Sequence, residues 1–476
     1  MNKYKKLAFN TIIFAIGSFG SKILVLFLSR LYTTNIGSAD SSTKDLLEIT
    51  ANFLLPIFTF SITEAIIRYG LDKKYNKGEV FTTATILNSV GLVLMVIVAP
   101  ILRFVPFLDF INGHTILLLV YVCTSAIRAL CSQFVRARGM VKLFSLDGII
   151  ATLTLFIFNI IFISVFHWGV KGFMLSVILS DFCSALFLFF TAKLHRFLNI
   201  RFYNKRLATA MMKFSVPLIP TVVMWVITGF SDRLFIRYMQ SDTVMLGESA
   251  AGIYGYANKI PNLISLISTI FLPAWNMSTI MENESKDRGR FYEKVYSAYE
   301  SVLFIASAFL IAGVQIITPI FINSKNFSEY GDVYLYTPVL VIAVLFMCLN
   351  QFLSCIYTAT KNTKNSFWTS LCAGVMNIIL NFFLIPEWGI QGASIASFLS
   401  YLLCFLIRLI DARYYIPFKF SGIKLALNTA ALILLAVFVI FEPALYGLWI
   451  FIVLAFVVIS NYQSLIETVK KVLKRG

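Results

Sequence analysis

Apolar stretches long enough to cross a lipid bilayer recur along the whole chain, with short polar segments between them. A transmembrane helix needs about 20 mostly apolar residues, and a helix satisfies its backbone hydrogen bonds internally, as a bilayer requires. The composition agrees, because 59% of the residues are hydrophobic and only 13% are charged, whereas soluble domains contain about 25% charged residues. The sequence therefore predicts an all-α polytopic membrane protein.

We expect about fourteen transmembrane helices, with boundaries set by the apolar windows. These windows lie near residues 8–32, 47–69, 81–102, 115–135, 146–166, 173–192, 209–237, 252–276, 295–322, 333–358, 367–386, 391–410, 423–441 and 446–465. The first window follows a basic segment and contains no small-residue cleavage site, so we interpret it as a retained span and not as a signal peptide.

Lysine and arginine are concentrated in alternate predicted loops. With a cytoplasmic N-terminus, the inner segments hold 27 of them, and five lie outside: Lys44, Arg103, Lys171, Arg237 and Lys325. Cytoplasmic loops carry such an excess, so we expect both termini in the cytoplasm. The net charge of +17 then reflects orientation and contact with anionic membrane lipids, and we expect no nucleic-acid partner.

A short motif repeats between the two halves of the chain. The pattern Trp-Gly-(Val or Ile)-x-Gly occurs at residues 168–172 and 388–392, each in a predicted outer turn. Six predicted spans separate the copies and preserve their orientation, which favours a parallel repeat; two unrelated glycine turns are the alternative. The predicted organisation is two six-helix lobes, 1–206 and 207–414, followed by 415–476 with the last two helices and a basic tail.

Sequence motifs of several enzyme classes are missing. The chain contains no G-x-x-x-x-G-K-[ST] phosphate loop and no H-E-x-x-H motif, which are signatures of nucleotide and zinc sites. The predicted outer loops are about 20 residues or shorter, which leaves little room for an extracytoplasmic catalytic domain. We therefore expect no enzymatic activity, no metal and no cofactor.

Charged side chains within the predicted spans are the strongest functional signal. Each costs about 2.5–3.5 kcal/mol at the bilayer centre, so it normally faces a cavity or a partner. These residues are Lys22, Glu64, Arg68, Arg128, Asp147, Asp181, Lys213, Asp232, Arg233 and Lys259. Lys213 lies near a span end and can reach the head groups. The acids Glu64, Asp147, Asp181 and Asp232 are candidates for ion coupling.

Two pairs among these charges are close in sequence. Glu64 and Arg68 are four residues apart, on one helical face and in the order that favours pairing, so a structural ion pair is the alternative to a functional role. Asp232 and Arg233 are adjacent and point about 100° apart, so one of them needs a partner elsewhere.

Prolines lie within three of the predicted spans. Pro56 is in the second, Pro217 and Pro220 are in the seventh, and Pro261 is in the eighth. Proline removes a backbone donor and opens a helix, which predicts breaks suited to helices that bend during transport; a packing role is the alternative. The cations on these and neighbouring spans suit an anionic head group such as a diphosphate, because Arg and Lys bind phosphate oxygens through charge-assisted hydrogen bonds.

Several segments, taken in order and spacing, carry a family resemblance. They are FSVPLIPTVVMWVITGFSDRLFI (Phe214–Ile236), AGIYGYANKI (Ala251–Ile260), the pair Ala274 and Trp275, Tyr330–Phe346, ATKNTKNS (Ala359–Ser366) and IPEWGIQGASIAS (Ile385–Ser397). With them, essentially the whole chain resembles the Wzx-type oligosaccharide flippases of the multidrug/oligosaccharidyl-lipid/polysaccharide exporter superfamily.

This resemblance implies a V-shaped pair of lobes that alternates between inward-open and outward-open states. It implies an undecaprenyl-diphosphate-linked oligosaccharide as substrate, for capsule, exopolysaccharide or O-antigen, with a polysaccharide polymerase and a chain-length regulator as further partners. Cavity roles are implied for Lys22, Glu64, Arg68, Arg128, Asp232, Arg233 and Lys259. The alternatives are another cargo, namely lipid II, a teichoic acid precursor or a drug, and a scaffold of a polysaccharide synthesis complex that transports nothing.

Overall fold

The computed structural model describes residues 24, 27–72, 74–100, 106–282, 287–360 and 363–473. Throughout these ranges, every regular element is a helix. By contacts, the chain divides into two compact units, Ile23–Leu234 and Phe235–Gly476, which we call the N-terminal and C-terminal units. The division falls inside one helix, α9, and the lobe limits at 206/207 and 414/415 stay a prediction.

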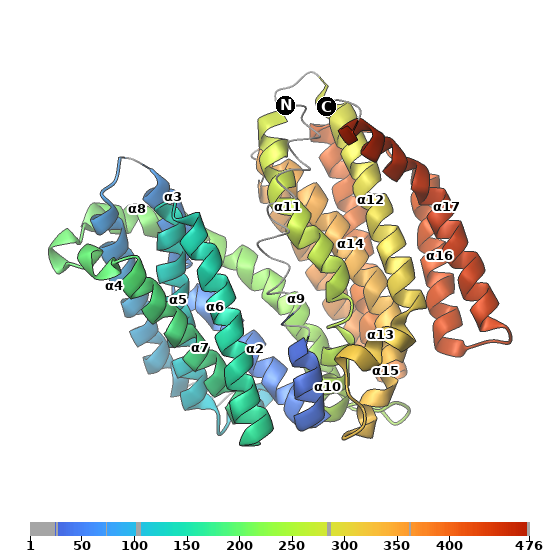
Figure 1. The fold of residues 1–476 in the computed structure, drawn as a ribbon, viewed down its shortest axis with the longest axis horizontal. Helices are drawn as coiled ribbons and strands as arrows, with labels where there is room; N and C mark the ends of the chain where they lie inside the picture. The colour runs from blue at the N-terminus through green and yellow to red at the C-terminus, as the bar shows by residue number, and fades with distance from the viewer. Residues whose placement is uncertain are drawn as a thin grey trace. The chain divides into compact units, whose positions relative to one another are not determined.

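The N-terminal unit begins its labelled helices at Ser38 (Figure 1). Its elements are α2 (Ser38–Phe58), α3 (Ile62–Leu71), α4 (Lys77–Val98), η2 (Pro106–Ile111), α5 (Thr115–Ala137), α6 (Val141–Asn159), the π-helical η3 (Ile160–Val165), α7 (Gly169–Thr191), η4 (Leu194–Phe197), η5 (Ile200–Phe202), α8 (Lys205–Ser215), η6 (Val216–Leu218) and α9 (Ile219–Tyr238).

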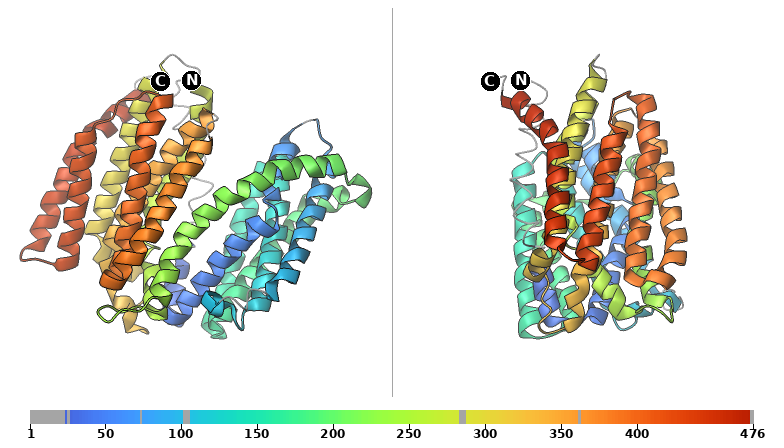
Figure 2. Two further views of the ribbon diagram at one scale, coloured as in Figure 1. Left: turned by 180° about the vertical axis from the view of Figure 1, so that it is seen from behind. Right: turned by 90° about the vertical axis from the view of Figure 1, so that its right-hand side faces the viewer.

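The C-terminal unit continues from the end of α9. Its elements are α10 (Glu248–Ala257), α11 (Asn262–Glu282), α12 (Arg288–Ala312), α13 (Val314–Phe321), η7 (Ser328–Asp332), α14 (Val333–Ala359), α15 (Thr363–Tyr415), α16 (Gly422–Phe441) and α17 (Tyr446–Leu473). Helices α16 and α17 pack against each other and against α12, at one edge of this unit (Figure 2).

The helices confirm the predicted polytopic membrane fold. Among the described residues, nine helices are long and apolar enough to cross a bilayer, and the pair α2 and α3, bent by 54°, adds a tenth. Helix α15 contains two of the predicted spans, because the non-helical Gly389 separates its halves. The predicted seventh and eighth spans each correspond to two shorter helices, α8 with α9 and α10 with α11.

Breaks occur in all three spans where prolines predicted them. In the second span, Pro56 precedes the break between α2 and α3, where Phe60 and Ser61 have positive φ angles. In the seventh, Pro217 lies in the short 3-10 turn η6 that joins α8 to α9. In the eighth, Pro261 lies in the turn between α10 and α11. The prediction of broken helices is therefore confirmed.

The first glycine of the repeated tryptophan-glycine motif has a positive φ angle in both copies. Gly169 and Gly389 have φ angles of +51° and +55°, in the left-handed region that glycine adopts without steric cost. Three residues later, a Cβ atom on Gly172 would lie 3.0 Å from the carbonyl oxygen of Phe162, and one on Gly392 would lie 2.2 Å from that of Leu384. Each motif thus closes a tight turn between two packed helical segments.

Each unit has its own aromatic and aliphatic core. In the N-terminal unit, α3, α4, α5, α7 and α8 bury a shared cluster, in which Phe81 and Phe134 stack with ring centroids 4.4 Å apart. In the C-terminal unit, Trp275 of α11 is fully buried and stacks on Phe352 of α14 at 4.5 Å. These cores hold the helices that carry the charged residues.

Candidate functional site

One network in the N-terminal unit joins three of the predicted charges. Arg128 on α5 binds Asp181 on α7 through a 2.9 Å contact between its Nη1 and Oδ1 atoms, and its Nη2 lies 3.9 Å from Oδ2 of Asp147 on α6. The sequence assigned Arg128 to cargo binding and the two aspartates to ion coupling. The fold brings all three into one site, because α7 packs against both α5 and α6.

Two serines complete this network. Ser184 accepts a 2.9 Å hydrogen bond from Nε of Arg128 and donates its own proton to Asp147, while Ser125 donates to Asp181. The side chains of Asp147 and Asp181 are only 2% and 8% exposed, whereas that of Arg128 is 31% exposed. The carboxylates are thus enclosed, and the guanidinium remains open on one side.

The charges in this network do not balance. With both carboxylates charged, two acids face one guanidinium, so these three described side chains together carry one excess negative charge in a region shielded from water. Buried charge is costly unless it is paired. A proton or a small cation bound with the two aspartates would restore neutrality, so the arrangement can take up and release one positive charge.

A second charged cluster forms where α2 meets α9. Lys44 lies 2.6 Å from Asp45 and faces the rings of Tyr32 and Phe173 at 4.9 and 4.8 Å. Arg233 approaches the other oxygen of Asp45 at 3.9 Å. The expectation that one residue of the pair at 232 and 233 needs a partner elsewhere is therefore confirmed, and that partner is on α2.

Lys44 is not in a loop, as the sequence suggested. Helix α2 begins at Ser38, and the Lys44 side chain is 1% exposed. The apolar window started at residue 47 because polar residues dominate the first two turns of α2, which are buried against the rest of the unit. Asp232 is also buried, at 4% exposure.

Glu64 and Arg68 share the short helix α3, but they do not form the ion pair that their spacing allows. Both are exposed, and neither has an ion partner within 4.0 Å in the part of the chain that the structure describes. Arg68 lies over the ring of Phe214 at 5.8 Å. Lys259 lies in the turn between α10 and α11, in the C-terminal unit. Lys22 lies outside the described residues.

Sequence reasoning overlooked a buried arginine in the C-terminal unit. Arg408 is 0% exposed; its guanidinium donates to Thr369 Oγ1 and the Asn350 carbonyl, both at 2.9 Å, and to Ser370 Oγ at 2.7 Å. Arg408 lies near the end of a predicted span, where a charged side chain can reach the head groups and does not indicate a buried site. Asn350 and Thr369 lie about 220 residues after Arg128 and Asp147, which is also the spacing of the repeated motif.

Sequence reasoning also overlooked Glu300 on α12. It is 4% exposed and lies beside Ser301, whose hydroxyl accepts a 3.1 Å bond from Lys424 on α16. The same Lys424 donates to Ser464 on α17 at 3.3 Å. A glutamate inside the predicted span 295–322 was a sequence signal that could have identified Glu300. The hydrogen bonds of Lys424 connect α16 and α17 to each other and to α12.

Known structures with the same fold are membrane transporters. A lipid II flippase, MurJ, in an inward closed conformation is similar over 96% of this chain and 100% of its own, with a TM-score of 0.73 and 16% identity. An inward-facing multidrug resistance transporter of the MATE family covers 87% of this chain and 99% of its own, with a TM-score of 0.66 and 14% identity. A transporter of the MOP superfamily from Pyrococcus furiosus covers 87% and 97%, with a TM-score of 0.60 and 14% identity.

Sequence comparison adds one curated relative. An uncharacterized membrane protein of Methanocaldococcus jannaschii is 24% identical over 264 residues, which are 52% of this chain. The match spans 59% of the length of that relative. No known family profile matches the chain. The protein is thus a multi-pass membrane protein with the fold shared by MurJ and by MATE transporters of the MOP superfamily.

Proposed function

We propose that this protein is a flippase that moves oligosaccharides linked to undecaprenyl diphosphate from the cytoplasmic to the outer leaflet of a bacterial cytoplasmic membrane. One observation carries the proposal. The lipid II flippase aligns with 96% of this chain, whereas the multidrug transporter aligns with 87%. The fold of a lipid flippase thus accounts for more of the chain, which supports a lipid-linked cargo for capsule, exopolysaccharide or O-antigen synthesis.

The exposed cations provide contacts for the diphosphate. Arg68 is exposed in the last turn of α3, the short helix that follows the break, so its guanidinium is available for bidentate bonds to phosphate oxygens. Lys259 is half-buried and Lys22 lies outside the described residues, so both stay candidates on the basis of the sequence alone. Arg233 contacts Asp45, so its proposed role is to stabilise the packing of α9 against α2. This contact changes during transport.

The Arg128 network provides the coupling. When this network is open to one side of the membrane, the excess negative charge of Asp147 and Asp181 binds a proton or a cation. When that ion leaves, both carboxylates pair more strongly with Arg128. Helix α7, which carries Asp181 and Ser184, thereby shifts against α5. Glu64 and Asp232 remain candidates for a second step in the same cycle.

The membrane potential favours the proposed direction. With a negative cell interior, moving one negative charge outward releases about 2.3 kcal/mol per 100 mV. The field therefore favours outward movement of an anionic diphosphate. After the cargo is released, the protein returns to its inward-open state with the ion bound at the Arg128 network. Both termini in the cytoplasm place the basic connections on the side where the cargo is made.

The test is complementation of a deletion strain with measurement of both surface polymer and lipid-linked intermediates. Deletion should remove the surface polysaccharide and leave the lipid-linked repeat unit on the inner leaflet. Wild type and Lys213→Gln, an exposed residue on α8, should restore export. Asp181→Asn and Arg68→Gln should be expressed in the membrane and fail to restore it.

Two results would reject the proposal. Normal surface polymer in the deletion strain, with no accumulated intermediate and no second transporter gene, would show that a lipid-linked oligosaccharide is not the cargo. Full export by Asp181→Asn and Arg68→Gln would remove both assigned mechanisms.

Export of a different cargo is the second candidate. The likeness to a multidrug transporter over 99% of its length favours a drug, and the likeness to a lipid II flippase favours lipid II or a teichoic acid precursor. Increased drug sensitivity of the deletion strain, with unchanged surface polymer, would select the drug. A scaffold without transport predicts that the charge-neutralising variants leave polymer synthesis intact.

A further inference from the structure

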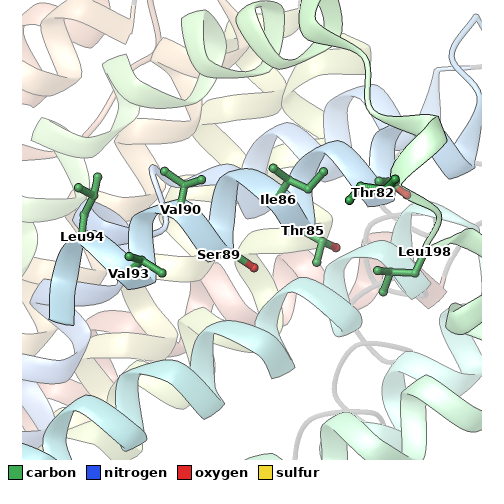
Figure 3. Close-up of a pocket in the computed structure, with 9 residues that line it drawn as sticks. Thr82, Thr85, Ile86, Ser89, Val90, Val93, Leu94 and Leu198 are labelled. Atoms are coloured by element: carbon green, nitrogen blue, oxygen red, sulfur yellow. The ribbon is translucent and has the colours of Figure 1, made fainter. Parts of the chain in front are cut away.

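A slot lies along the outer face of α4, away from the charged network. It has a volume of about 540 Å³, and at one end the connection between α7 and α8 places Leu198 beside Thr82 (Figure 3). Its lining comes from one face of α4 and two residues of that connection: Thr82, Thr85, Ile86, Ser89, Val90, Val93, Leu94, Leu198 and Ile200.

The connection is held firmly against the start of α4. Thr82 donates a 2.7 Å hydrogen bond to the Phe197 carbonyl and accepts one of 3.2 Å from the Asn199 amide. Asn204 donates from its side chain to Glu79 at 2.9 Å. These bonds attach the connection to α4 beside one end of the slot.

The polarity of the slot changes along its length. Its hydroxyl-bearing residues, Thr82, Thr85 and Ser89, are near the connection, and its far end is lined by Val90, Val93 and Leu94. From Thr82 to Leu94 the helix rises roughly 18 Å at about 1.5 Å per residue. That is close to the depth of one leaflet, about 15 Å of a hydrocarbon core of about 30 Å.

The connection itself combines basic and apolar side chains. Between residues 193 and 206 it contains five Lys or Arg and no acid: Lys193, Arg196, Arg201, Lys205 and Arg206. All five are exposed. Leu198 and Ile200, between them, are 44% and 80% exposed. Apolar side chains exposed among cations are typical of a segment at the membrane surface, in contact with anionic lipids.

We propose that this slot binds one anionic phospholipid, with an acyl chain along α4 and its phosphate at the basic connection. The apolar far end accepts the chain, the exposed Ser89 faces the ester region, and Arg196 and Arg201 bind the phosphate. A zwitterionic lipid has the same chains, but its own cation competes with these arginines for the phosphate. The site therefore selects by head-group charge and not by chain alone.

The test uses the purified full-length protein and native mass spectrometry to count retained lipids. Phosphatidylglycerol and phosphatidylcholine with identical chains are added separately, and we expect at least about five-fold greater retention of phosphatidylglycerol. Val90→Trp fills the slot, and the double variant Arg196→Gln with Arg201→Gln removes the charge; each should abolish this preference. Glycerol phosphate, which has the head group without chains, should not displace the lipid.

Matched variants separate this site from general lipid contact. Ile97→Trp alters a residue of α4 that is 66% exposed and outside the slot, and Lys419→Gln removes an exposed cation of another connection; both should keep the preference. Ser89→Phe fills the slot independently if Val90→Trp does not fold. Equal retention of the two lipids by wild type, equal losses in the control variants, or full displacement by glycerol phosphate would each overturn the proposal.

Discussion

The Arg128 network leads to an asymmetric prediction for two substitutions that remove opposite ends of the same ion pair. Asp181→Asn leaves Arg128 facing Asp147 alone, a balanced pair that keeps its serine hydrogen bonds. Arg128→Gln leaves Asp147 and Asp181 together with no cation. If charge balance governs this site, losing the arginine must be far more damaging than losing the aspartate.

The magnitudes follow from burial and distance. Removing one partner of a buried ion pair costs about 3–5 kcal/mol, and the lower end applies because the Arg128 side chain is 31% exposed. Replacing a charged hydrogen bond by a neutral one at 181 costs about 1 kcal/mol. For a unit of this size, 1 kcal/mol shifts the unfolding midpoint by about 2–4 °C. We expect Arg128→Gln to lower it by roughly 6–12 °C and Asp181→Asn by about 2–4 °C.

The assay is thermal unfolding of the purified protein in one detergent, with Ser184→Ala as a variant that removes hydrogen bonds but no charge. Ser184→Ala should resemble Asp181→Asn. A drop for Asp181→Asn as large as that for Arg128→Gln would refute the charge-balance reasoning, because it would mean that all three ionised groups are needed for the fold. Export assays of the same variants then report the coupling role independently of stability.

Three further predictions use the same thermal unfolding assay. Gly392→Ala should cost about 1–3 kcal/mol, because a Cβ atom would lie 2.2 Å from a backbone oxygen, which forces a backbone shift. Gly422→Ala, where the nearest atom is at 3.6 Å, should stay within about 0.5 kcal/mol. Arg408→Lys should cost about 2–4 kcal/mol, because one ammonium cannot reach the acceptors on both α14 and α15. The control Arg413→Lys, at an exposed position, should leave stability unchanged. Equal effects of the two substitutions would contradict this reasoning. Lys44→Met should lower stability by about 3 kcal/mol, because the buried carboxylate of Asp45 loses its 2.6 Å ion pair. An unchanged midpoint would show that the lysine is not needed there.

The sequence by itself determined the class of the fold and several local features. Apolar length decides whether a segment can span a bilayer, and the described helices agree with the windows. Proline acts through its own missing donor and ring, so the breaks before α3, in η6 and before α11 were readable without any tertiary information. The same holds for Gly169 and Gly389, whose backbone conformation depends on the local turn.

Only the tertiary structure decided which charges meet. Arg128, Asp147 and Asp181 lie on three different helices, and nothing in their spacing shows that α7 packs against both α5 and α6. Glu64 and Arg68 have the right spacing for a pair yet remain apart, because the free energy of an exposed ion pair is small. Lys44 and Arg408 seemed to be at span ends, where charge costs little. Their burial depends on partners such as Asp45, Thr369 and Asn350, and such contacts are set by how helices distant in sequence pack together.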